Sequence, residues 1–138
     1  MSAEPSVRTP LYENHAALGA RMAPFAGYAM PIVYTGIAGE HSAVRNSCGA
    51  FDVSHMGRLR FQGPSGESAL QRLTTIHVPA VQPGFARYGL ILNDGAGIID
   101  DVFLYAVRAG EYLLVVNAAN RHAVLTRLEE LGLRYQSR

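Results

Sequence analysis

The stretch Asn93-Asp-Gly-Ala-Gly-Ile-Ile-Asp-Asp-Val-Phe-Leu-Tyr105 combines a tight turn, a strand and two adjacent acids. Its first five residues are types that tolerate positive φ or bond to their own backbone, which is typical of a turn. The residues that follow are mostly β-branched or aromatic, which indicates a strand. The stretch therefore predicts one arm of a β-hairpin and, with it, an antiparallel sheet.

Strand alternation assigns the two acids to different faces of this predicted strand, because successive side chains point in opposite directions. One face carries Ile99, Asp101, Phe103 and Tyr105, and the other carries Ile98, Asp100, Val102 and Leu104. A carboxylate beside aromatic rings suits a flat, nitrogen-rich ligand that needs a proton acceptor. On spacing alone, however, the pair is also typical of solvated acids at the end of a hairpin.

The chain from residue 51 onward alternates between strand and helix patterns. The predicted order is strand, helix, three strands joined by tight turns, helix and strand, at residues 51–62, 63–75, 86–92, 98–107, 111–117, 120–131 and 133–138. Ala69, Leu70 and Leu73 are expected to face the core. This order predicts an α+β domain close to a split βαβ sandwich.

The first fifty residues do not complete a core of their own. Residues 1–8 are expected to form a disordered lead, and Thr9-Pro10 is expected to cap and start a helix. A second amphipathic helix is predicted over residues 37–48. Residues 25–31 read as a loop or a short extended piece, so this part is expected to contain little sheet.

Composition excludes several classes of function. The net charge of +1 gives no electrostatic case for binding nucleic acid or a membrane surface, and the absence of Lys excludes a Schiff base or a Walker lysine. The five histidines lack ligand spacing, and Cys48, the one cysteine, is expected in the core, so we expect neither a metal site nor a disulfide. Without an apolar span or a signal peptide, a bacterial cytoplasm fits best.

Two other motifs give weaker indications of function. Asp52, Ser54 and His55 contain the residue types of a hydrolase triad, but on a regular strand Ser54 and His55 face apart. Gly95 and Gly97 precede a strand rather than a helix, so they do not predict a dinucleotide site. Tyr88 and Asn117 are expected on strands near the hairpin, where either can line a pocket or belong to ordinary sheet surface.

Six blocks of this sequence stand in a distinctive order: Thr9-Pro-Leu-Tyr12, Phe25-Ala-Gly-Tyr-Ala-Met-Pro31, Glu40-His-Ser-Ala-Val-Arg45, Phe51-Asp-Val-Ser-His-Met56, Gly97-Ile-Ile-Asp-Asp-Val102 and Val115-Val-Asn-Ala-Ala-Asn120. In these blocks and their order the chain resembles the aminomethyltransferase (T-protein) family of the glycine cleavage system. Dimethylglycine and sarcosine dehydrogenases carry a similar module. Family members are more than twice this long, so the chain resembles their amino-terminal portion.

The resemblance implies a reaction and a set of site residues. T-proteins transfer the methylene carbon of an aminomethyl group, carried on the lipoyl arm of the H-protein, to tetrahydrofolate and release ammonia. The family's catalytic aspartate matches Asp101, and Met56, Tyr88, Tyr105 and Asn117 match positions near the folate. No metal is implied. The family residues that hold the rest of the folate lie further along, so this portion alone is expected to be inactive.

The resemblance also implies a domain organisation. Residues 9–51 correspond to the amino-terminal part of a discontinuous folate-binding domain, and residues 52–138 to a ferredoxin-like α+β domain. The apolar helix faces of the first part would then lack their partners, and self-association is expected. The alternative function is a non-catalytic folate-binding or scaffold module descended from the same superfamily.

Overall fold

The computed structural model describes residues 6–137, and the chain divides into two compact units, Met1–His55 and Met56–Arg138. Of the expected disordered lead, residues 1–5 lie outside the described part, whereas Val7–Arg8 form strand β1. The expectation of disorder is therefore wrong for residues 7 and 8.

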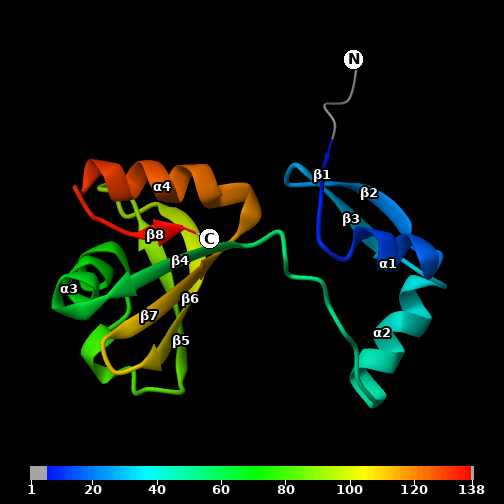
Figure 1. The fold of residues 1–138 in the computed structure, drawn as a ribbon, viewed down its shortest axis with the longest axis horizontal. Helices are drawn as coiled ribbons and strands as arrows, with labels where there is room; N and C mark the ends of the chain where they lie inside the picture. Colours follow the sequence, from blue (N-terminus) through cyan, green and yellow to red (C-terminus); the bar gives the residue numbers. More distant parts are fainter. Residues whose placement is uncertain (1–5, 138) are drawn as a thin grey trace. The chain divides into compact units, whose positions relative to one another are not determined.

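The second unit is built on an antiparallel sheet, which has five strands within the described residues and the order β5-β6-β7-β4-β8 (Figure 1). The strands are β4 (Gly57–Gln62), β5 (Ala86–Leu92), β6 (Ile98–Arg108), β7 (Glu111–Val116) and β8 (Gln136–Ser137). β4 and β6 flank β7, and both run antiparallel to it. This arrangement confirms the predicted α+β class with a split βαβ sheet.

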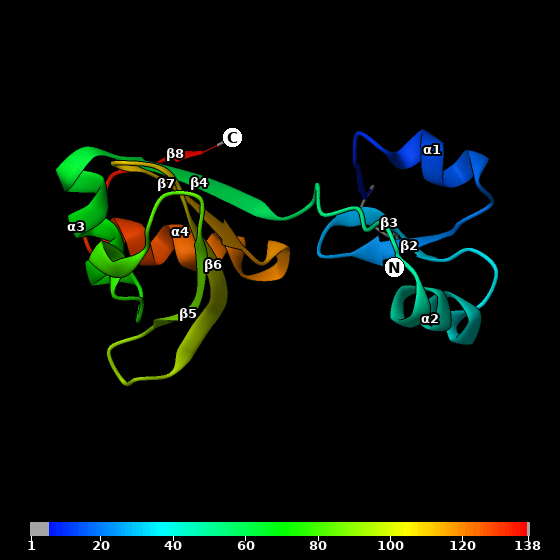
Figure 2. The same ribbon diagram turned by 90° about the horizontal axis from the view of Figure 1, so that it is seen from below.

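Two helices, α3 (Gly63–Leu73) and α4 (Arg121–Glu130), cover one face of this sheet (Figure 2). Short 3₁₀ turns, η1 (Val78–Ala80) and η2 (Ala118–Asn120), connect the elements. Both helices contribute to one apolar core, in which Leu70, Leu104 and Leu128 have no exposed surface. The predicted inward residues of α3 are all buried. Burying such a side chain stabilises a fold by about 1.5–3 kcal/mol.

The first strand of this unit is shorter than its sequence pattern predicts. The expected strand over residues 51–62 is wrong in its first half, because β4 begins at Gly57. A Cβ at Gly57 would lie 2.6 Å from Cγ2 of its cross-strand partner Val116, so the pairing requires glycine there. At the other end of the chain, the observed strand is shorter than the one expected over residues 133–138, because β8 consists of two residues.

The first unit contains a small sheet that the sequence did not indicate. β2 (Arg21–Phe25) and β3 (Tyr28–Val33) form a hairpin, and β1 pairs in parallel with β3. Ala26 and Gly27 have φ values of 49° and 83° and make the tight turn between them. Of the two alternatives for residues 25–31, the extended piece is therefore confirmed by β3, and the loop is limited to the turn at Ala26 and Gly27.

The helices of the first unit are shorter than predicted and weakly buried. α1 spans Tyr12–Ala17 and begins after Leu11, so Thr9 is not its cap. α2 spans Ile37–Asn46, and none of its residues, all of which the structure describes, is buried. Cys48 is exposed rather than in the core. Glu40 holds the start of α2, because its Oε1 accepts hydrogen bonds from the backbone nitrogens of residues 34–36. These backbone donors lower the pKa of Glu40.

Asp52 organises the polar interior of the first unit. Its Oδ2 accepts a hydrogen bond from Thr9 Oγ1 at 2.7 Å and lies 3.0 Å from His15 Nε2, while Oδ1 accepts from Ser54 N. His15 Nδ1 lies 2.7 Å from the hydroxyl of Tyr34. Burial alone would raise the pKa of Asp52, but the hydrogen bonds from Ser54, His15 and Thr9 hold it well below its ordinary value. His15 is therefore a buried, hydrogen-bonded residue of the interior.

Candidate functional site

Asp101 lies on the face of the second unit's sheet opposite the helices. Val102 and Leu104 on β6 point into the core, whereas Asp101, Phe103 and Tyr105 are exposed. This confirms the alternation that the sequence predicts from residue 100 onward. The assignment of Ile99 to the exposed face is wrong, because the ladder with β5 shifts register between Ile91 and Leu92 and Ile99 packs against the core.

Three aromatic rings line the same face next to Asp101. Tyr88 on β5 is directly opposite Phe103 on β6, with ring centroids 5.5 Å apart in an edge arrangement. The Phe103 and Tyr105 centroids are 6.3 Å apart. Tyr88 remains 57% exposed and Tyr105 42% exposed. The rings therefore form an open aromatic surface, which suits a flat ligand.

Asn117 connects the two acids at the end of β7. Its Nδ2 donates to Asp100 Oδ1 at 2.9 Å, to the Asp101 carbonyl at 2.9 Å and to Asp101 Oδ1 at 3.0 Å. Asp100, 1% exposed, also accepts from the Asn117 backbone nitrogen and from Asn120 Nδ2. Asn117 thus holds one oxygen of the Asp101 side chain, and Asp101 as a residue is exposed.

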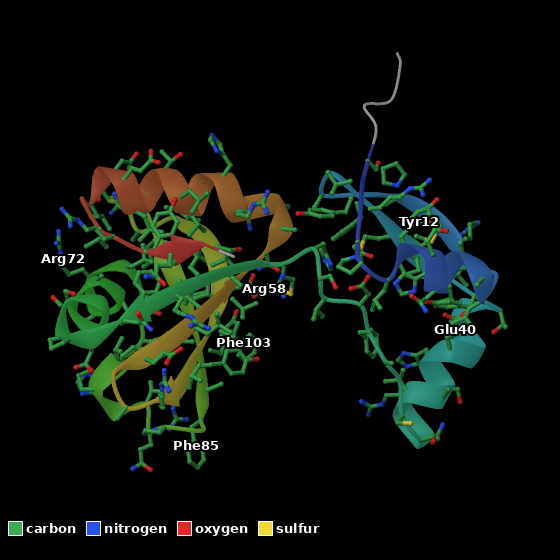
Figure 3. All side chains as sticks on the ribbon, viewed as in Figure 1. Tyr12, Glu40, Arg58, Arg72, Phe85 and Phe103 are labelled. Carbon is green, nitrogen blue, oxygen red and sulfur yellow. The ribbon has the colours of Figure 1, made fainter. Side chains whose placement is uncertain are left out.

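Met56 joins this site through the register of the sheet. Gly57 pairs with Val116, so the preceding Met56 and the following Asn117 lie at the same end of adjacent strands. Along the next row of the same face, Tyr88, Phe103, Val115 and Arg58 occupy paired positions; Phe103 and Arg58 are labelled in Figure 3. The fold therefore brings Tyr88, Asp101 and Tyr105 to one face of the sheet, with Asn117 directly after β7 and bonded to Asp101, and Met56 directly before β4.

Two features of this site were missed in the sequence. Asn120, at the start of the helix predicted over residues 120–131, makes no side-chain cap bond and instead donates to Asp100 at 2.7 Å. Arg58 and Arg60 follow strict alternation on β4 and lie in register with the aromatic rows. Their pattern was visible in the sequence, but only the strand order places them beside β7.

The hydrolase motif has a different environment from the one expected. Asp52 and Ser54 lie outside β4, so the strand geometry that separated Ser54 from His55 does not apply. Asp52 pairs with His15 rather than His55. His55 packs edge-on against the rings of Phe25 and Tyr28, and its buried Nδ1 has no hydrogen-bond partner among the residues that the structure describes. The motif therefore does not form a triad.

Over residues 6–137, no cluster of three or more His, Cys, Asp or Glu side chains is arranged to hold a metal ion. In the same part of the chain, no helix has the length and apolarity needed to cross a membrane.

Comparison with known proteins gives a consistent match. The family model described as GCVT N-terminal domain matches residues 11–133. The aminomethyltransferase of Rubrobacter xylanophilus is 55% identical over 115 residues, which are 83% of this chain and 30% of that protein. The aminomethyltransferase of Thermus thermophilus is 46% identical over 125 residues, 91% of this chain and 36% of the relative.

A solved structure matches the fold as well. The crystal structure of glycine cleavage system aminomethyltransferase T from Bartonella henselae superposes with a TM-score of 0.87 at 34% sequence identity. The superposition covers 96% of this chain and 38% of that chain. The chain thus spans about a third of the length of the curated relatives it matches.

Proposed function

Because this chain belongs to the family of GCVT N-terminal domains, we propose that it forms the amino-terminal part of a tetrahydrofolate-dependent aminomethyltransferase of the glycine cleavage system. Relatives and a solved structure that carry the aminomethyltransferase name support this proposal. The lipoylated H-protein is the proposed partner, tetrahydrofolate the proposed substrate and the bacterial cytoplasm the proposed compartment.

The proposed reaction moves one carbon between two carriers. The C–S bond between the methylene carbon and the lipoyl sulfur breaks, as does the C–N bond to the amino group. Two new C–N bonds join the carbon to two folate nitrogens, whose protons leave with the sulfur and the ammonia. The products are methylenetetrahydrofolate, ammonia and the dihydrolipoyl arm, so no oxidant or reductant is required.

Asp101 is the proposed catalytic residue, and its geometry is the observation that carries the proposal. Asp101 is exposed on the aromatic face, and Asn117 holds its Oδ1. A carboxylate in that position can accept a hydrogen bond or a proton from a folate nitrogen, which raises electron density at the nitrogen that attacks the methylene carbon. Positioned acid–base help of this kind contributes about 10²–10⁴-fold.

The remaining site residues are proposed to bind and orient the folate. Tyr88 and Tyr105 offer ring faces for a flat pterin, and Met56 and Asn117 border Asp101 at the end of the sheet. Orientation of two reactants supplies much of an enzymatic rate enhancement. We assign residues 9–51 to a discontinuous folate-binding domain and residues 52–138 to the ferredoxin-like domain.

A chimera tests this function. In it, the chain replaces the matching segment of the Thermus thermophilus aminomethyltransferase, to which it is 46% identical. The chimera is expected to release ammonia and form methylenetetrahydrofolate from the aminomethylated H-protein. Asp101→Asn, which keeps the size of the side chain, is expected to lower kcat by about 10²–10⁴-fold while tetrahydrofolate binding is retained.

Asp94→Asn is the matched control, because Asp94 lies in the same hairpin with its side chain 91% exposed. Near-normal turnover in Asp101→Asn would refute the catalytic role of Asp101. A folded chimera that binds tetrahydrofolate without any turnover would favour the non-catalytic module instead.

A further inference from the structure

Asp100, the neighbour of the proposed catalytic residue, is a buried carboxylate. It lies on the core face of β6 with Val102 and Leu104, and only 1% of its surface is exposed. Burying an ionised carboxylate is strongly unfavourable unless hydrogen-bond donors replace the lost water. The donors that surround Asp100 therefore identify what this side chain holds in place.

All of these donors come from one short segment, residues 117–120, that links β7 to α4. Asp100 Oδ2 accepts from the Asn117 backbone nitrogen at 2.9 Å, and Oδ1 accepts from Asn117 Nδ2 at 2.9 Å and Asn120 Nδ2 at 2.7 Å. An ionised carboxylate only accepts hydrogen bonds, so both amides must turn their nitrogen towards it. A flipped Asn117 amide would set oxygen against oxygen.

The orientation imposed on Asn117 extends to Asp101. The amide nitrogen of Asn117 carries two hydrogens, and the one that is not directed at Asp100 faces Asp101. The Nδ2 atom of Asn117 is 2.9 Å from the Asp101 carbonyl oxygen and 3.0 Å from Asp101 Oδ1. One buried acid thereby sets the direction of the donor that holds the exposed acid.

We propose that Asp100 is a positioning residue that acts through the Asn117 amide to hold the Asp101 carboxylate in its reactive orientation. This inference rests on the function proposed for Asp101. It differs from a purely structural role, in which loss of Asp100 would weaken the fold but leave the surviving folded molecules fully active. Two measurements distinguish the positioning role from the structural role: the NMR signal of the Asn117 side-chain amide, and kcat.

The spectroscopic test uses the 138-residue chain itself, by NMR of the Asn117 side-chain amide and the Asp101 carboxyl carbon. In the wild type, we expect the Asn117 Nδ2 protons to exchange slowly with water and to show a scalar coupling across the hydrogen bond to the Asp101 carboxyl carbon. In Asp100→Asn, that protection and that coupling are expected to be lost while the backbone signals of β6 and β7 persist. Asp94→Asn, in the exposed turn of the same hairpin, is expected to retain both.

If Asp100→Asn does not fold, the measurement on the wild type still tests the proposal. Fast exchange of the Asn117 Nδ2 protons in the wild type would overturn it, as would unchanged protection and coupling in Asp100→Asn. Asn120→Ala removes one donor and leaves the other two to Asp100. It is expected to preserve the coupling between Asn117 and Asp101, and loss of the coupling there would place the orienting role in Asn120 instead.

The kinetic test uses the Thermus thermophilus chimera. Asp100→Asn is expected to lower kcat by about 10²-fold, the effect of a small misplacement of a reacting group, with little change in KM for tetrahydrofolate. A folded Asp100→Asn chimera with wild-type kcat would overturn the positioning role. An inactive wild-type chimera, together with an intact NMR coupling, would instead refute the transferase proposal and support the contact between Asp100, Asn117 and Asp101.

Discussion

Asp100 and Asp101 are adjacent in the chain but lie on opposite faces of β6, one 1% exposed inside the core and the other exposed beside aromatic rings. The two carboxylates nevertheless share a donor, because Asn117 Nδ2 lies within 3.0 Å of an oxygen of each. Their side chains thus have different surroundings and one common partner.

The first prediction is that the two acids differ in their contribution to stability. Asp100→Asn replaces one accepting oxygen by an NH2 group, which sets donor against donor in the buried cluster, and is expected to lower the free energy of unfolding by about 1–3 kcal/mol. Asp101→Asn, on the exposed face, is expected to change it by less than about 0.5 kcal/mol. Urea unfolding followed by circular dichroism measures both. Equal losses would show that Asp101 also contributes to the fold.

The faces of β6 were predictable because a regular strand has a period of two, and between residues 100 and 106 this strand is regular. The partners of the acids were not predictable in the same way. Asn117 and Asn120 reach Asp100 only because β7 lies beside β6, and strand order is a tertiary property. The shift next to Ile99 likewise depends on β5 and not on the local sequence.

The first fifty residues were less predictable because tertiary contacts override their local patterns. Thr9-Pro10 has the composition of a helix start, but the hydroxyl of Thr9 bonds to Asp52, forty-three residues away. The segment from Asp52 alternates like a strand, but Asp52 is held by His15 and bonds the backbone of Ser54. The contacts of Asp52 with Thr9 and His15 are long-range and leave no local signal, whereas its bond to Ser54 N is local.

A second prediction concerns Gly89, on β5 against the core. A Cβ at this position would lie 2.3 Å from Cγ1 of Ile76, which is buried. Gly89→Ala is therefore expected to destabilise the second unit by about 1–3 kcal/mol through overpacking. Gly95→Ala, where the nearest atom is 3.5 Å away, is the matched control and should change stability by less than about 0.5 kcal/mol. A tolerated Gly89→Ala would contradict the close approach of β5 to Ile76.

A third prediction tests the aromatic surface. Tyr88→Ala in the chimera removes a ring that packs edge-on against Phe103 and that we propose contacts the flat pterin. An aromatic contact of this kind contributes about 0.5–1.5 kcal/mol to binding. Calorimetry should therefore show tetrahydrofolate binding weakened by roughly two- to tenfold. Tyr88→Phe keeps the ring and is expected to bind nearly as well as the wild type. If the loss appears in both variants, the hydroxyl rather than the ring makes the contact.

A fourth prediction follows from the lowered pKa of Asp52. Hydrogen bonds from Ser54, His15 and Thr9 hold this pKa below the ordinary value of 3.8, so the unfolded chain binds the proton more readily. The stabilising contribution is therefore fully present above that ordinary value and is lost as the pH falls below it. Urea midpoints followed by NMR signals of Tyr34 should decrease between pH 5 and pH 3, about the range in which an unfolded aspartate titrates.

Asp52→Asn is the control for this pH dependence. It is expected to lower the stability of the first unit at pH 6 and to flatten the decrease below pH 5, since the titrating group is gone. An unchanged slope in Asp52→Asn would assign the acid sensitivity to another carboxyl group.

The last prediction concerns association of the isolated 138-residue chain. The first unit exposes large apolar side chains, among them Leu18 at 72%, Ile37 at 73% and Phe51 at 72%. Exposed apolar surface of this kind favours association, because burying one such side chain is worth about 1.5–3 kcal/mol. We expect the chain to self-associate through its first unit, whereas a fragment of residues 56–138, which carries the apolar core of the second unit, should behave as a monomer.

Sedimentation at several concentrations tests this expectation. The experiment uses Cys48→Ser, because Cys48 is exposed and a disulfide between two copies would mimic association. A larger sedimentation coefficient at higher concentration is expected for the whole chain and a constant one for the fragment. A compact monomer at every concentration, with residues 9–50 protected from proteolysis, would show that the first unit satisfies its apolar surface within this chain. That result would refute the assignment of residues 9–51 to a domain completed elsewhere.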